Sequence, residues 1–226
     1  MFIGHFSAAF VAAAASRRAP SLPTLFVGAQ LVDWVFFTFT LIGLEQMRVV
    51  PGITAMNPLD LYFMPYTHSL LGTAVWGLAF ALFALVRWRN AVPAVIGFFV
   101  VLSHWILDLV THRPDLTLAG GDHKIGLGLW DYPWAAISLE LALILGSFAY
   151  FMSRTRGPIA PPLILIGVML IMQAINWFGP EPTEAGPALY LTALLSFLIV
   201  TLIAAWVGAT RWHKREVGLA VASLQR

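Results

Sequence analysis

The sequence contains no cysteine among its 226 residues, which excludes disulfide bonds and thiolate metal ligands. Charged residues are also scarce, at 11% of the chain, whereas a typical soluble domain carries about 25%. The net charge is +2, but the basic residues are scattered in pairs and form no stripe, so nucleic acid is not an expected partner. Any metal ion bound by this chain must therefore be held by His, Asp or Glu.

Apolar sequence is what the chain has in quantity, with 59% of its residues hydrophobic. A helix needs roughly 20 apolar residues to cross the hydrocarbon of a bilayer, and most of the apolar stretches are long enough. We therefore predict an all-α fold, a polytopic transmembrane helix bundle of about seven helices in a lipid bilayer, the first one short. The predicted helices cover residues 2–16, 22–44, 66–86, 91–111, 133–152, 161–178 and 187–209.

These helices fill the chain, so the sequence predicts one integral membrane domain over residues 1–226. The residues that could carry chemistry fall within 1–150, and two additional helices follow within 161–209. The first segment has the small residues of a secretory signal, but Arg17 and Arg18 follow its apolar run instead of preceding it. We therefore expect this segment to be retained in the protein.

The distribution of basic residues predicts the orientation in the membrane, because cytoplasmic loops are enriched in Lys and Arg. Only Arg48, Arg113 and Lys124 fall on one set of predicted loops. We therefore expect the N-terminus outside and the C-terminus in the cytoplasm. The opposite set holds the other ten of the 13 basic residues: Arg17, Arg18, Arg87, Arg89, Arg154, Arg156, Arg211, Lys214, Arg215 and Arg226.

Ionisable side chains inside the hydrocarbon are costly and need a partner or a purpose. In the stretch SHWILDLVTHRPD, His104, Asp108 and His112 follow one another at four-residue spacing, which places them on one helix face. Such a His–Asp pair could hold one metal ion from adjacent turns, or it could be a buried hydrogen bond that ties helices together. Asp33 lies within a predicted helix with no basic residue nearby. A bound cation would keep it ionised, or it could be a neutral acid that is hydrogen-bonded to a backbone carbonyl or to Gln30.

Five side chains form the predicted metal site, because all of them fall in the outer half of the predicted bundle. Three imidazoles and two carboxylates make a nitrogen and oxygen ligand set that suits zinc best, with manganese or iron as the other choices. A second group, Asp60, His112 and Glu140, is predicted to orient the ligands or to act as general base. The predicted ligands are His5, Asp33, His68, His104 and Asp108.

The motif residues resemble one known family. An N-terminal His5, Asp33 on the second helix, the triplet Thr67–Ser69 and the stretch Ser103–Asp108 resemble the membrane-bound metal-dependent hydrolases of bacteria. That family is similar in motif to zinc-dependent enzymes of the phospholipase C type. The resemblance covers about residues 1–150, and it implies a metal-dependent hydrolase of phosphoesters.

We therefore predict a membrane-embedded metal-dependent hydrolase of a phosphoester or lipid-like substrate, with Arg113 or Lys124 available for a phosphate. Two alternatives remain. A transporter of metal ions or other cations, or a metal-handling membrane protein, would use the same ligands and would need polar groups in the cytoplasmic half. A non-catalytic membrane protein would use the His–Asp pairs only to join helices, and would hold no metal.

Overall fold

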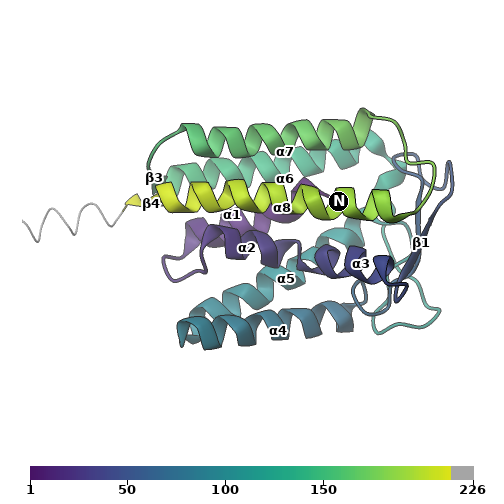
Figure 1. The fold of residues 1–226 in the computed structure, drawn as a ribbon, viewed down its shortest axis with the longest axis horizontal. Coiled ribbons are helices and arrows are strands. Elements are labelled where there is room, and N and C mark those ends of the chain that lie inside the picture. The colour runs from purple at the N-terminus through teal and green to yellow at the C-terminus, as the bar shows by residue number, and fades with distance from the viewer. Residues whose placement is uncertain (215–226) are drawn as a thin grey trace, which may run out of the picture.

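The computed structural model describes residues 1–214, and it is a bundle of α-helices with small strand pairs at its ends (Figure 1). A short 3₁₀ turn, η1 (Ile3–His5), opens the chain, and a second, η2 (Leu129–Asp131), precedes α6. The predicted all-α bundle is confirmed. The α-helices are α1 (Phe6–Ala15), α2 (Leu22–Ala29), α3 (Leu31–Leu41), α4 (Leu70–Trp88), α5 (Ala91–Thr111), α6 (Pro133–Arg154), α7 (Ala160–Phe178) and α8 (Pro187–Thr210).

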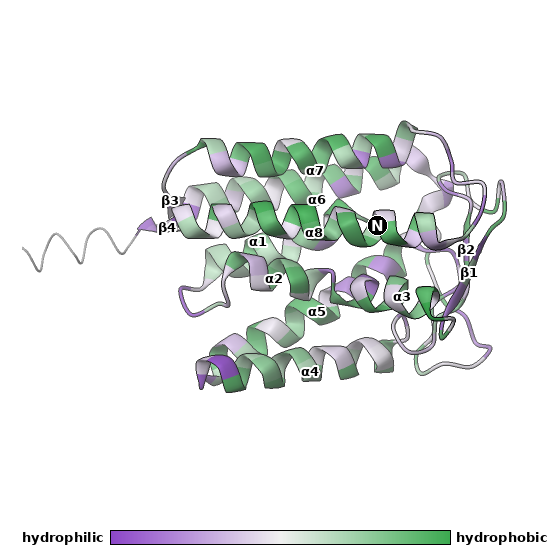
Figure 2. Cartoon of the chain, viewed as in Figure 1, coloured by the Kyte–Doolittle hydropathy of each residue, from purple (hydrophilic) through white to green (hydrophobic). Residues whose placement is uncertain are grey.

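The helices carry the features of a membrane protein. Among the described residues, α4 to α8 are each long and apolar enough to cross a bilayer, and α2 and α3 together could make a sixth span. The outward face of α4 is a stripe of apolar side chains, including Leu71, Val75, Leu78 and Leu82, each more than half exposed. An exposed apolar face of this size is typical of a surface that contacts lipid, because its exposure to water would be unfavourable. Figure 2 shows apolar helices between polar ends.

Two of the predicted helices differ in the structure. The helix predicted over 22–44 is broken at Gln30, where α2 and α3 meet at a bend of 54°. The first helix, Ile3–Ala15, has 13 residues and falls short of a full span, because a helix rises only about 1.5 Å per residue against a hydrocarbon core of about 30 Å. His5 is 1% exposed and Met1 is half-buried beside it.

Small residues let the helices around the break come close together. The Phe80 ring of α4 lies against Gly28 of α2 and Gly97 of α5, where an added Cβ would meet ring atoms at 2.9 Å and 2.7 Å. Glycine at these positions therefore permits a close approach that alanine would block. The Phe80 ring thus packs α2 and α5 together beside the break at Gln30.

The two ends of the bundle differ in character (Figure 1). One end carries the long loops, a hairpin of β1 (Gln46–Val49) and β2 (Leu59–Phe63) and the loop between α5 and α6. The other end carries the short basic connections and the pair β3 (Thr155–Arg156) and β4 (Trp212–His213). The N-terminus lies nearer to the end with the long loops (Figure 1).

Candidate metal centre

The five predicted ligands converge in the structure. His5 ends η1, Asp33 lies in the first turn of α3, and His68 immediately precedes the N-cap of α4. His104 and Asp108 lie one turn apart on α5. Two overlapping groups have ligand atoms close enough to hold a metal ion, namely His5, His104 and Asp108, and Asp33, His68 and His104. The chain therefore contains a buried cluster of His and Asp side chains that could bind metal.

In one half of the cluster, the Nε2 atoms of His68 and His104 lie between the carboxylates of Asp33 and Asp108. His68 Nε2 lies 3.2 Å from Asp33 Oδ1 and 3.6 Å from Asp108 Oδ2. His104 Nε2 lies 3.5 Å from Asp33 Oδ1 and 3.1 Å from Asp108 Oδ2. Ligands bound tetrahedrally at about 2.0–2.1 Å stand about 3.3–3.4 Å apart. The donor set and its spacing therefore fit a zinc-sized ion.

The other oxygen of Asp108 faces different groups. His5 Nε2 lies 3.1 Å and His112 Nε2 3.4 Å from Asp108 Oδ1. The Met1 amino nitrogen lies 3.1 Å from the same oxygen and 3.4 Å from His5 Nε2. The two carboxylate oxygens of Asp108 are thus directed to two sets of nitrogen atoms.

Hydrogen bonds on the far side of the rings direct the Nε2 atoms inward. The Thr67 hydroxyl donates to Glu45 Oε2 at 2.6 Å, so its oxygen is left to accept from His68 Nδ1 at 2.9 Å. His104 Nδ1 donates to the carbonyl oxygen of Ala29 at 2.9 Å. A ring that carries its proton on Nδ1 has a free electron pair on Nε2, which is the atom a metal needs.

His104 shows the clearest demand for a further partner. Its side chain is completely buried, and its Nε2 lacks a hydrogen bond to any residue in the described part of the chain. The nearby Asp108 Oδ2 is close enough for ion pairing but outside hydrogen-bond geometry. A buried polar atom without a partner is costly, and a metal ion at this position would satisfy it.

The break between α2 and α3 builds two parts of the centre. It leaves the Ala29 carbonyl free of the helix ladder for His104, and it starts a new helix just before Asp33. A carboxylate in the first turn of a helix is stabilised by the helix dipole. Gln30 Nε2 holds Asp33 Oδ2 at 2.5 Å, which leaves Asp33 Oδ1 for His68 and His104. Irregular backbone at membrane depth is tolerated where it lines such a site.

Glu45 is a buried acid that the sequence did not identify. Its Oε1 accepts the backbone N–H groups of Tyr66 at 2.8 Å and Thr67 at 3.0 Å, which fixes the segment before α4. Burial raises the pKa of Glu45, although the hydrogen bond from Thr67 opposes this shift. Ser69 caps α4 by accepting from Gly72 N at 2.9 Å, as expected for a hydroxyl at the start of a helix.

The three side chains predicted to assist the ligands lie in different surroundings. His112 reaches Asp108 directly, and its Nδ1 is 2.9 Å from Asp115 Oδ1. Glu140 accepts the backbone N–H groups of Phe2 and Gly4, each at 2.9 Å, and so holds the turn that carries His5. Asp60 is ion-paired with two arginines at the loop end.

The cations considered for a phosphate already have partners. Arg113 is ion-paired with Asp60, which also binds Arg48 Nε at 2.6 Å. Lys124 Nζ donates to the carbonyl oxygens of Tyr62 at 3.0 Å and Asp115 at 3.2 Å. A substrate phosphate at this end would therefore have to compete with Asp60 for Arg113.

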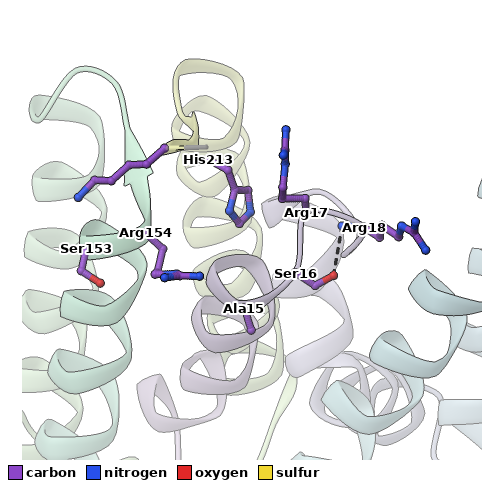
Figure 3. A pocket seen from close by; sticks show the side chains of 8 residues that line it. Ala15, Ser16, Arg17, Arg18, Ser153, Arg154 and His213 are labelled. Carbon is purple, nitrogen blue, oxygen red and sulfur yellow. Dashed lines mark hydrogen bonds between the residues drawn. The ribbon is translucent and has the colours of Figure 1, made fainter. Parts of the chain in front are cut away.

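Two surface pockets lie away from the metal cluster. A basic pocket at the opposite end, shown in Figure 3, lies between the ends of α1 and α6 and is lined by Ala15, Ser16, Arg17, Arg18, Ser153, Arg154, His213 and Lys214. An apolar groove between α3 and α4 is lined by Phe39, Leu44, Pro65, Tyr66, Ser69, Leu71, Gly72, Val75, Trp76 and Ala119. The groove borders the segment that holds His68, whereas the basic pocket is remote from every predicted ligand.

Comparisons of the chain with protein-family models, with curated proteins and with solved structures found no match. The geometry of the cluster is therefore the basis for assigning a function.

Proposed function

We propose that this protein is a membrane-embedded metal-dependent hydrolase, a member of the bacterial family whose motifs it resembles. The observation that carries the proposal is the convergence of five side chains from four separate segments into two overlapping ligand groups that share His104, namely His5, His104 and Asp108, and Asp33, His68 and His104. Helix packing alone does not require so many donors at ligand spacing, and the unpartnered Nε2 of His104 supports a metal ion as the common partner.

Zinc is the proposed metal, because a mixed imidazole and carboxylate set without thiolates suits it, with manganese or iron as the alternatives. Such an ion makes a bound water acidic enough to ionise near neutral pH and polarises a phosphoryl oxygen. The protein's own part is to fix the ligands and to exclude bulk water. Asp33 is the ligand with the most exposed side chain, at 16%, so substrate is proposed to approach from its side.

A phosphoester on a lipid-like molecule is the proposed substrate. The apolar groove between α3 and α4 is bordered by Tyr66 and Ser69, which flank Thr67 and His68 in sequence. A hydrocarbon chain in this groove would place its polar end next to the residues that hold His68. From the family resemblance we propose a bacterial inner membrane as the location of the protein. The distribution of Lys and Arg supports an orientation with the long loops outside.

The position of the buried acids favours a hydrolase over a transporter. Among the described residues, the acids within α-helices are Asp33, Asp108 and Glu140. Asp33 and Asp108 contact the same imidazoles, and Glu140 holds the turn that carries His5. A transport path should continue through the other half of the membrane.

Hydrolysis by purified protein tests the proposal. The protein, reconstituted in lipid and loaded with zinc, is given a panel of phosphoesters and phospholipids with and without a chelator. We expect hydrolysis of at least one member, its loss on chelation, and its loss in His104→Ala. His123→Ala is the matched control, because His123 is an exposed histidine of the outer loop.

A rate that is equal in His104→Ala and in the unmodified protein would refute the proposed hydrolase. Metal content measured on the same samples separates the alternatives. Protein that binds a whole number of metal ions per chain but hydrolyses nothing would favour transport or metal handling. Protein that purifies without metal and takes up none on loading would favour a purely structural role for the His–Asp contacts.

A further inference from the structure

The two oxygens of Asp108 are approached from different directions. Oδ2 faces His68 and His104, at 3.6 Å and 3.1 Å. Oδ1 faces His5 at 3.1 Å, His112 at 3.4 Å and the Met1 amino nitrogen at 3.1 Å. A carboxylate that serves one ion needs only one of these sets. Asp108 has the arrangement of a carboxylate that bridges two positions.

The rings of His5 and His104 cannot both serve a single ion well. They are stacked with centroids 3.6 Å apart and planes only 5° from parallel. The electron pair of an imidazole nitrogen lies in the plane of its ring, so each ring favours an ion in its own plane. Two nearly parallel planes at this separation share no such point. Two ions held by these rings would instead be separated by a similar distance, and paired metal sites have ions about 3.5–4 Å apart.

His112 has the environment of a metal ligand. Its Nδ1 is 2.9 Å from Asp115 Oδ1, which matches the carboxylate–histidine–metal arrangement and leaves Nε2 for Asp108 Oδ1 and its surroundings. The ring packs against Trp130 with centroids 4.1 Å apart. The His112 backbone is also fixed, because its N–H donates to the Asp108 carbonyl at 2.8 Å and its carbonyl accepts from Gly128 at 2.7 Å.

We propose that the centre holds two divalent metal ions bridged by Asp108, and that His112 is a ligand of the second. The first ion takes Asp33, His68, His104 and Asp108 Oδ2. The second takes His5, His112 and Asp108 Oδ1, and Asp115 is the positioning residue of His112. This inference rests on the proposed metal centre and extends it by one ion and one ligand.

The two positions differ in the number of protein ligands. The first has four, which closes a tetrahedron. The second has three side-chain ligands, and the Met1 amino nitrogen lies beside it, 3.1 Å from Asp108 Oδ1 and 3.4 Å from His5 Nε2. His112 would therefore determine whether an ion occupies the second position.

Metal stoichiometry tests the inference without an activity assay. The full-length protein is stripped with chelator, reloaded with zinc, desalted and analysed for metal per chain. We expect two ions in the unmodified protein, one in His112→Ala and two in the control His123→Ala. Asp115→Asn should keep the fold and weaken the second ion by about 10- to 100-fold, which is the usual effect of removing such an outer partner.

A spectroscopic measurement covers the case in which His112→Ala does not fold. With manganese in place of zinc, two ions bridged by Asp108 couple their spins, so the unmodified protein should give a coupled signal at full loading. Asp115→Asn should give an uncoupled signal at limiting manganese.

The failures can be told apart. One ion in both the unmodified protein and His112→Ala, with an uncoupled manganese signal, would overturn the second position and leave the proposed hydrolase with a single metal. Two ions in both samples would overturn the role of His112. Unmodified protein that binds no zinc would overturn the metal centre itself, and with it the proposed function.

Discussion

Replacing Thr67 by valine tests how the protein prepares His68 for a metal. Valine keeps the shape of threonine but removes the hydroxyl that accepts from His68 Nδ1 at 2.9 Å and donates to Glu45 at 2.6 Å. A bound ion needs the proton on Nδ1, because it uses the electron pair of Nε2. Without the hydroxyl, the metal-free protein can move that proton to Nε2, where Asp33 Oδ1 lies 3.2 Å away.

The size of the effect follows from the buried hydrogen bond. Thr67 is completely buried and His68 is 2% exposed, so water does not replace the lost acceptor. Leaving a buried N–H without a partner costs about 1–3 kcal/mol. In the Thr67→Val protein this cost applies to the metal-bound form, whereas the metal-free form avoids it by changing the tautomer of His68. The variant should therefore bind zinc about 5- to 150-fold more weakly than the unmodified protein.

The assay is zinc affinity measured by competition with a coloured chelator in detergent solution. Thr67→Ser is the matched control, because serine keeps the hydroxyl, and its affinity should stay close to that of the unmodified protein. Thermal unfolding of both variants confirms that the fold is retained. A folded Thr67→Val protein that binds zinc as tightly as Thr67→Ser would refute the reasoning about the His68 tautomer.

Three further perturbations test other parts of the centre. Glu140→Ala leaves the N–H groups of Phe2 and Gly4 without their acceptor. Its melting temperature should therefore fall by more than that of Glu140→Gln, which keeps an acceptor oxygen. Equal falls in the two variants would contradict this role of Glu140. In Gly126→Ala the new Cβ would lie 2.2 Å from the Arg113 carbonyl oxygen, so the loop after His112 must shift and the variant should retain less zinc. Gly146→Ala is the control, because its Cβ meets nothing within 4 Å. Equal zinc content in the two variants would argue against a link between this loop and the metal centre. Zinc at 100 times its dissociation constant should stabilise the fold by about 2.7 kcal/mol. A chelator should therefore lower the melting temperature of the unmodified protein by more than that of His104→Ala.

The sequence was sufficient to predict the bundle and the metal candidates because both signals are local. Long apolar runs identify the spans, and the four-residue spacing of His104 and Asp108 places them on one face of α5. The grouping of His5, Asp33 and His68 with that pair followed from their common depth, because polar groups at one level of an apolar bundle have few other partners.

The remaining features depend on contacts between distant residues. The break at Gln30 places a carbonyl opposite His104, 75 positions further along the chain, and no pattern within 22–44 indicates it. Glu45 acts through Thr67, which lies 22 positions away, and both loops had to be in place before that contact could be recognised. Asp115 lies only three residues from its partner His112. That short spacing was the one local signal that could have indicated the contact between them.

The most direct test of a metal centre in this protein is anomalous X-ray scattering at the zinc edge from crystals of the zinc-loaded chain. We predict anomalous density between Asp33, His68 and His104, and a second peak on the side of His5. Anomalous density found only at surface histidines such as His123, with none beside Asp108, would contradict the account.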